Sequence, residues 1–131
     1  MNKVQLELKG KRGRLISKHL RLAEFECKCS HPECSVTYID YRVGVCFENL
    51  RALLGNKPLY ITSGYRCIRH NHDLREKYGT SELSQHMLGR ALDIAIPPGV
   101  EYSEMVEKAN QSGFTFVYAK KDKGFVHCDI R

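Results

Sequence analysis

The sequence lacks any long apolar segment. No run of eighteen apolar residues occurs in the 131-residue chain, and its first twenty residues have no continuous apolar core of the kind found in a secretory signal. We therefore expect neither a membrane partner nor an export signal. A clear disulfide framework is also lacking: the six cysteines are too few and too unevenly spaced to establish one, so reduced thiols are expected.

Acidic residues are scarce compared with basic ones, which gives a formal net charge of +6 and a pI of about 9.1. Such an excess suits nucleic acid, anionic lipid or an anionic cell-wall polymer, and charge alone does not choose among them. We expect a basic N-terminal arm over residues 1–14 and one domain over residues 15–131. The basic residues near the start are Lys3, Lys9, Lys11, Arg12, Arg14, Lys18 and Arg21.

One short stretch is dense in soft metal ligands: Cys27, Cys29, His31 and Cys34 lie within eight residues. A structural zinc ion would fit there if the loop folded around it. However, the spacing is not the paired C-x-x-C of common zinc sites. A surface loop with reduced cysteines, or with one local disulfide, is the interpretation we favour.

Apolar periodicity predicts several helices and strands. From Asp40 to Leu54, apolar residues recur at helical spacing, with Asp40 as N-cap and Gly55 as terminator. Cys46 lies on the apolar stripe and is expected in the core. Shorter patterns predict an element that docks on the core over 15–26, strands over 58–62, 91–96, 114–118 and 125–130, a short helix or turn over 70–78 and a helix over 102–112.

Two stretches far apart in the chain carry the chemistry. Asp93 shares a strand face with Ala91 and Ala95, because side chains alternate along a strand, and His127 and Asp129 share a face of the last strand. Cys128 then points the other way, into the core. His86, Asp93 and His127 together offer two imidazoles and one carboxylate, which suit zinc and leave one position open for water. The set predicts a hydrolytic metal centre.

Arg66 follows directly after the expected strand 58–62, where loops often carry functional groups. Its planar guanidinium donates hydrogen bonds in pairs and stays charged, so it suits an oxyanion or a carboxylate. The neighbouring triplet His70-Asn71-His72 invites comparison with His-Asn-His nucleases. In that signature the three residues are widely separated, whereas here they are adjacent, so no specific nucleic-acid partner is expected.

The pattern Ser63-Gly64-Tyr65-Arg66, Asn71, Ser84-x-His86-x-x-Gly89-x-Ala91-x-Asp93 and His127-x-Asp129 resembles that of a zinc peptidase family. The family comprises D-Ala-D-Ala carboxypeptidases, vancomycin-resistance dipeptidases, phage L-Ala-D-Glu endolysins and the hedgehog signalling domain. The resemblance runs from about Ser17 to Arg131. It implies a small α+β domain with a central antiparallel sheet and flanking helices, one zinc ion, and hydrolysis of stem peptides in bacterial peptidoglycan.

The resemblance also implies roles for individual residues. His86, Asp93 and His127 resemble the three zinc ligands. Arg66 resembles the arginine that stabilises the oxyanion or holds the substrate. Ser84 resembles the serine that supports the site, and Ser84, Tyr65 and Arg66 are the expected substrate-binding residues.

One position departs from the family pattern. Many relatives have an acidic residue three positions before the last histidine ligand, where this chain has Gly124. Asp129 or Asp122 would then be the general base, and we favour Asp129 because it shares the strand face of His127. Asp129 would otherwise support a histidine ligand. The departure keeps a second function open, a metal-stabilised binding module like the hedgehog relatives.

The expected partner is the peptidoglycan stem peptide, and the expected state is a monomer. The residues do not identify the bond that is cut, nor choose between carboxypeptidase and endopeptidase action. The missing export signal is compatible with a phage-encoded enzyme that reaches the cell wall after release from the cytoplasm.

Overall fold

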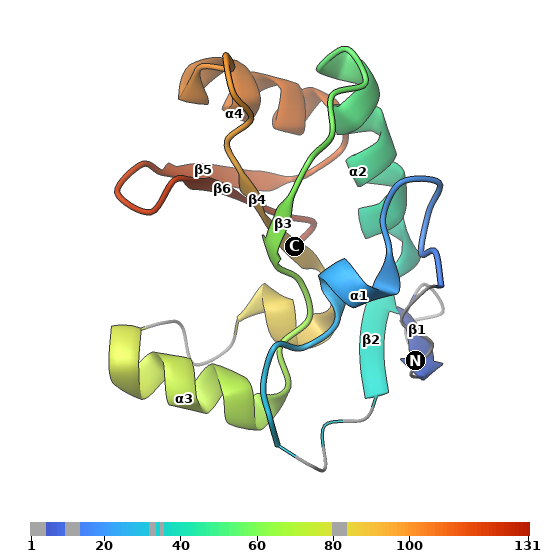
Figure 1. Cartoon of the computed structure of the whole chain (residues 1–131), viewed down its shortest axis with the longest axis vertical. Coiled ribbons are helices and arrows are strands. Elements are labelled where there is room, and N and C mark those ends of the chain that lie inside the picture. Colours follow the sequence, from blue (N-terminus) through green and yellow to red (C-terminus); the bar gives the residue numbers. More distant parts are fainter. Residues whose placement is uncertain (1–4, 10–13, 32–33, 35, 80–83) are drawn as a thin grey trace.

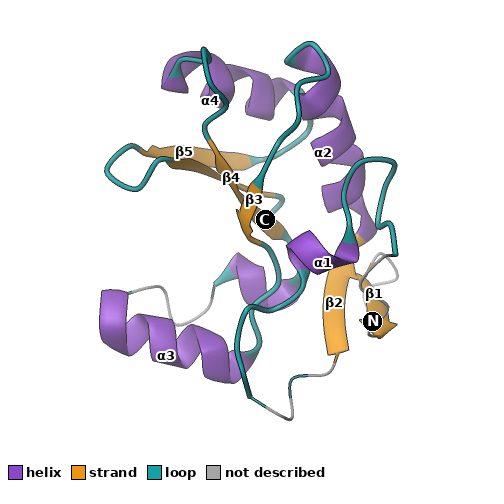
Figure 2. Cartoon of the chain, viewed as in Figure 1, coloured by secondary structure: helices purple, strands orange, loops and turns teal. Residues whose placement is uncertain are grey.

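The computed structural model describes residues 5–9, 14–31, 34, 36–79 and 84–131, which form two antiparallel sheets and a set of short helices (Figures 1 and 2). The strands are β1 (Gln5–Lys9), β2 (Val36–Asp40), β3 (Ile61–Ser63), β4 (Ala91–Ala95), β5 (Phe116–Lys120) and β6 (Phe125–Asp129). The helices are α1 (Leu22–Phe25), α2 (Tyr41–Leu53), α3 (Ile68–Tyr78), the 3-10 helix η1 (Gln85–Leu88) and α4 (Tyr102–Gln111).

The four-stranded sheet has the order β3-β4-β6-β5, with all neighbours antiparallel. Its two central strands are β4 and β6, which pair Asp93 with His127 and Ala91 with Asp129. β1 and β2 form a separate two-stranded sheet. An α+β fold with a central antiparallel sheet, as the resemblance implies, is therefore confirmed.

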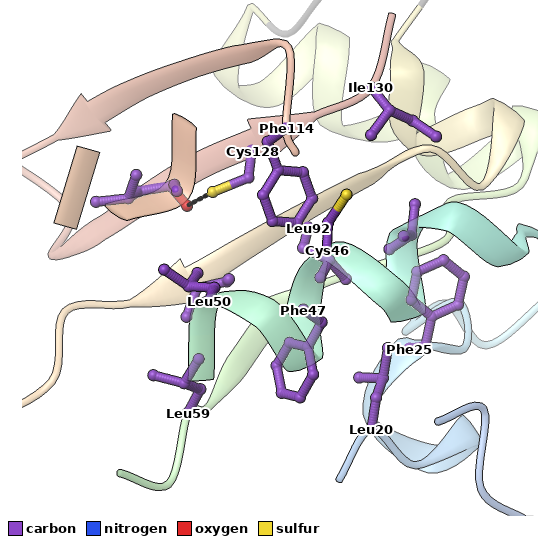
Figure 3. Close-up of a cluster of buried hydrophobic side chains, with 14 of the residues drawn as sticks. Leu20, Phe25, Cys46, Phe47, Leu50, Leu59, Leu92, Phe114, Cys128 and Ile130 are labelled. Carbon is purple, nitrogen blue, oxygen red and sulfur yellow. Dashed lines mark hydrogen bonds between the residues drawn. The ribbon is translucent and has the colours of Figure 1, made fainter. Parts of the chain in front are cut away.

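One face of the four-stranded sheet carries the hydrophobic core. Leu92 and Ile94 of β4 and Val126 and Cys128 of β6 are fully buried on this face, as the alternation along both strands predicts. Figure 1 shows α2 and α4 on one side of the sheet and α3 on the other. The side chains that α2 and α4 bury in this core are Val43, Cys46, Phe47, Leu50, Met105 and Ala109. Figure 3 labels Cys46, Phe47 and Leu50 among them. The opposite face carries the polar residues Asp93, His127 and Asp129, beside Ala91, Ala95 and Phe125.

Helix α2 begins as its capping residue predicts. The buried carboxylate of Asp40 accepts a hydrogen bond from the backbone N–H of Arg42 at 3.1 Å, which satisfies one of the free amides of the first turn. The same carboxylate contacts the guanidinium groups of Arg42, at 2.7 Å, and Arg90, at 3.4 Å. Asp40 therefore ties the start of α2 to the residue that precedes β4.

Some elements differ from the sequence prediction. β2 is not predicted, although its first four residues, Val-Thr-Tyr-Ile, all favour strands; its partner β1 lies in the segment expected to form the basic arm. The strand expected over 58–62 begins only at Ile61, since Pro58 has no N–H to donate. β5 runs to Lys120 instead of Tyr118, because Lys120 O accepts from both Lys123 N and Gly124 N in a tight turn.

No helix among the described residues is long and apolar enough to cross a membrane.

Candidate metal centre and its pocket

His86, Asp93 and His127 come together on the polar face of the four-stranded sheet. Each offers one ligand atom, and the three atoms lie within 4.8 Å of one another. Asp93 Oδ1 lies 3.2 Å from His86 Nε2 and 2.9 Å from His127 Nδ1. All three side chains are buried. The structure thus brings together the three residues that the sequence proposes as metal ligands.

The backbone explains why these side chains meet. Asp93 and His127 are direct partners in the β4–β6 ladder, so the sheet itself holds them side by side. His86 lies on η1. The N-cap of η1 is Ser84, whose hydroxyl accepts a hydrogen bond from His86 N at 3.2 Å. Gly89 ends η1 with φ +68, and a Cβ there would lie 2.1 Å from Tyr38 O, so only glycine fits this return.

The outer nitrogen of each imidazole is held in place. His86 Nδ1 donates to Gly64 O at 2.6 Å, and His127 Nε2 donates to Asp129 Oδ2 at 2.7 Å. His86 Nε2 and His127 Nδ1 then face Asp93, whose Oδ1 both contact, and these are the ring nitrogens that an ion would bind. Metal-binding histidines in proteins are held by such bonds to a carbonyl or a carboxylate, so the donor set fits a zinc ion.

Burial and hydrogen bonding set the charge states of the three residues. Burial lowers the pKa of His86 and outweighs the effect of Asp93, so this ring is neutral at pH 7. Burial alone would raise the pKa of Asp93, but hydrogen bonds with His127 and His86 hold it well below its usual range. Burial opposes protonation of His127, yet its bonds to Asp93 and Asp129 raise its pKa. The carboxylate of Asp93 therefore stays ionised.

Arg66 lies next to this set, two residues beyond Gly64. Its Nε donates to Ser63 Oγ at 3.2 Å, its Nη1 to Asn71 Oδ1 at 3.5 Å and its Nη2 to Asp93 Oδ2 at 3.4 Å. Burial lowers the pKa of Arg66 and the charge of Asp93 opposes this, so the guanidinium stays charged. The contacts fix the plane of the guanidinium beside the expected metal ligands.

A pocket of about 590 Å³ opens beside the three residues, between α3 and the sheet. Five cationic side chains line it, and Asp93 is the one carboxylate among its described lining residues. The cationic residues are Lys28, Arg66, Lys120, Lys123 and Arg131, and other lining residues include Ser84, His86, His127 and Tyr118. The pocket therefore attracts negatively charged groups.

The structure places the remaining proposed residues away from this lining. Asp129 is fully buried, and both its oxygens are engaged, by His127 and by the guanidinium of Arg131, whose Nη2 lies 2.6 Å from Oδ2. Asp122 is exposed in the turn between β5 and β6. Tyr65 is buried and packs edge-on against Tyr38, with ring centroids 5.9 Å apart. Of the described residues, none of these three lines the pocket.

Tyr118 and Arg131 also line the pocket, and no motif in the sequence points to either residue. Tyr118 is the ladder partner of His127, and its ring stacks on the imidazole with centroids 4.8 Å apart and an interplanar angle of 23°. Burial and the charge of Asp93 raise the pKa of Tyr118, so its hydroxyl stays protonated at neutral pH. The register of the hairpin would have identified Tyr118, but that register depends on where the turn closes.

A second group of possible ligands differs from the one expected around residues 27–34. The thiols of Cys27, Cys29, Cys34 and Cys67 lie within 4.8 Å of one another, whereas His31 Nε2 contacts Asp73 Oδ2 at 2.9 Å. Cys67 thus takes the place expected for His31. The sequence pattern missed it because Cys67 is distant along the chain.

A buried pair of histidines with an aspartate beside an open pocket is typical of metallopeptidases. The sequence model of the peptidase M15 family matches residues 18–129, and the chain belongs to that family of metallopeptidases. The family resemblance expected from the residues is confirmed. No match was found among curated proteins. Among solved structures, the chain is similar to the L-Ala D-Glu endopeptidase ChiX of Serratia marcescens, with 19% identity, a TM-score of 0.44, and coverage of 68% of this chain and 88% of that one.

Proposed function

We propose that the chain is a zinc-dependent peptidase that hydrolyses peptide bonds in the stem peptides of bacterial peptidoglycan. The observation that carries the proposal is the convergence of His86, Asp93 and His127, with both outer ring nitrogens anchored, at the wall of a cationic pocket. These three residues would hold the ion. A bound zinc ion supplies Lewis-acid chemistry, polarising a carbonyl and making water more acidic.

The cationic lining favours an acidic peptide. Stem peptides carry free carboxylates, and Lys28, Lys120, Lys123 and Arg131 offer several positive charges around the pocket. The lysines at the β5–β6 turn can contact carboxylates at different positions, because their ammonium groups are carried on flexible side chains. Charge complementarity of this kind speeds encounter and orients the peptide more than it adds affinity.

Arg66 is suited to bind the oxygen on which negative charge develops during peptide hydrolysis. Its guanidinium is already oriented by Ser63, Asn71 and Asp93, so little reorganisation is needed when substrate arrives. The hydroxyl of Tyr118, which stays protonated, is a further donor on the pocket wall. Ser84 holds η1, and through it His86, while also lining the pocket.

Asp129 acts as a positioning residue in this proposal. Its carboxylate accepts from His127 Nε2 and pairs with Arg131, and it is fully buried. A general base must reach the proton that it takes, and Asp129 has no face on the pocket. Asp122 also lies outside the described lining, but it is exposed in the turn that carries Lys120 and Lys123, so proton transfer by Asp122 requires this turn to fold over the site.

The second candidate function is a metal-stabilised binding module of the same fold. It is favoured by one observation: Asp93, a ligand in this proposal, is the one carboxylate among the described residues of the pocket lining. Such a module would bind an acidic peptide in the cationic pocket without cutting it.

Digestion of purified peptidoglycan distinguishes the two functions. The peptidase should release free amino groups from the wall, release should stop after chelation and return with added zinc, and mass spectrometry of the products identifies the bond. The His127→Ala variant should release none. If the zinc-loaded protein binds stem peptides but leaves them intact, the chain is a binding module.

A further inference from the structure

We infer that Cys27, Cys29, Cys34 and Cys67 bind a second zinc ion, separate from the His86–Asp93–His127 centre and structural in role. Their four sulfur atoms lie within 4.8 Å of one another. The Sγ atoms of Cys29 and Cys67 are 3.7 Å apart. In a tetrahedral site with Zn–S bonds of about 2.3 Å, neighbouring sulfur atoms lie about 3.8 Å apart. The thiols therefore already have the spacing of zinc ligands.

Backbone amides point at these sulfur atoms as they do at bound thiolates. Cys67 N donates to Cys27 Sγ at 3.3 Å, and His70 N donates to Cys67 Sγ at 3.4 Å. Cys67 is the N-cap of α3, where the helix dipole also favours negative charge. The sulfur atoms of Cys27 and Cys67 thus each accept a hydrogen bond that favours the thiolate, the form in which cysteine binds zinc.

The four cysteines are free thiols and none is fully buried. Hydrogen bonds among four protonated thiols would stabilise this cluster little, because S–H groups are weak donors and acceptors. Paired disulfides would bring the sulfur atoms to about 2.05 Å, far closer than Cys29 and Cys67 lie. A zinc ion satisfies all four sulfur atoms at once, and a site with four protein ligands has no position left for substrate.

The ion would join two segments that are distant in sequence. Residues 25–29 run beside residues 64–67: Tyr65 N donates to Phe25 O at 2.7 Å, and Cys27 and Cys29 meet Cys67 further along (Figure 1). Cys67 directly follows Arg66, whose side chain lines the pocket. The second ion would therefore hold Arg66 and the start of α3 in place.

Metal analysis of the full chain tests this inference without relying on peptidase activity. The His86→Ala/His127→Ala variant lacks the first centre. Purified with reductant from zinc-supplemented medium, it should retain about one zinc ion per chain, against about two in the unaltered chain. Adding Cys34→Ser should remove the remaining ion, whereas adding Cys46→Ser, a matched control in the core, should leave it.

Two further measurements separate the site from a folding defect. Cobalt loaded into the histidine variant should give the intense thiolate-to-metal charge-transfer absorption, which Cys34→Ser should abolish and Cys34→His should restore in altered form. Alkylation of the four thiols should accelerate after chelation. The inference is overturned if the histidine variant holds no metal while its thiols are free, or if intact mass shows these cysteines joined as disulfides. Because neither measurement uses peptidoglycan, an inactive protein with this zinc ion would refute only the proposed function.

Discussion

The two groups of possible metal ligands differ in how the fold holds them. We call His86, Asp93 and His127 the sheet site, and Cys27, Cys29, Cys34 and Cys67 the cysteine cluster. Two residues of the sheet site are ladder partners on central strands, and the site opens on a pocket. The cysteine cluster joins an irregular loop to the start of α3, and four protein ligands would close it. An open site on a rigid sheet suits catalysis, whereas a closed site between loops suits structural support.

The largest expected effect comes from removing a ligand of the sheet site. His127→Ala should lower kcat/KM for peptidoglycan release by more than roughly a thousandfold, because the ion that activates water is lost. His72→Ala, at an exposed histidine of α3, is the control and should keep full activity. Retained activity in His127→Ala would contradict the catalytic role of the sheet site. Zinc content should fall by about one ion per chain while the cysteine cluster stays loaded.

The next effect concerns the residue that links the two sites. Arg66→Lys keeps the charge but loses the planar group that contacts Ser63, Asn71 and Asp93. We expect kcat/KM to fall about 10²- to 10³-fold, with zinc content unchanged. Arg21→Lys, at an exposed position, is the matched control. A rise in KM with kcat unchanged would show that Arg66 binds substrate but does not act on the developing charge.

Asparagine substitutions at Asp129 and at Asp122 should have different effects on zinc affinity and activity. Asp129→Asn weakens the bond that orients His127, so zinc affinity and activity should each fall about 10- to 100-fold. Asp122→Asn should lower kcat without changing zinc affinity, because the turn does not contact the ligands. Zinc titration beside steady-state kinetics makes the comparison. Unchanged zinc affinity in Asp129→Asn would contradict its positioning role.

The smallest effect on activity should come from the cysteine cluster. Cys34→Ser should lower the melting temperature by roughly 5–10 °C, since binding energy of a structural ion is folding energy. The activity at low temperature should fall only about two- to tenfold, through looser placement of Arg66. Thermal unfolding with and without chelator provides the measurement, and Cys46→Ser is the comparison. Equal sensitivity of both variants to chelator would remove the distinction between the two sites.

The same contrast explains what the sequence could predict. His86 and Asp93 are seven residues apart and leave a local pattern, whereas His127 is predicted from strand alternation together with the family resemblance; helix α2 is predicted from its cap and apolar spacing. Cys67 was missed because only the tertiary fold brings it to Cys29, 38 residues earlier. Local spacing favoured His31, whose ring instead meets Asp73.

Other misses also depend on long-range pairing. Tyr118 faces His127 only in the observed register of the β5–β6 hairpin, and a shift of one residue would turn it to the other face. Asp129 lies on the expected strand face, yet Arg131 folds back over it, a contact with no sequence signature. β2 depends on β1 in the same way.

Gly64 connects these parts through its backbone and its lack of a side chain. Its carbonyl accepts the hydrogen bond that orients His86. A Cβ at position 64 would lie 2.5 Å from Phe25 O and 2.8 Å from Phe25 Cα, and these backbone atoms cannot move aside as the end of a flexible side chain could. The restriction is spatial, because Gly64 is not among the residues with positive φ. Even alanine at position 64 would have to displace α1. This would shift both Gly64 O, which accepts the hydrogen bond from His86, and the cysteines that follow α1. A single methyl group at position 64 would therefore disturb the sheet site and the cysteine cluster at the same time.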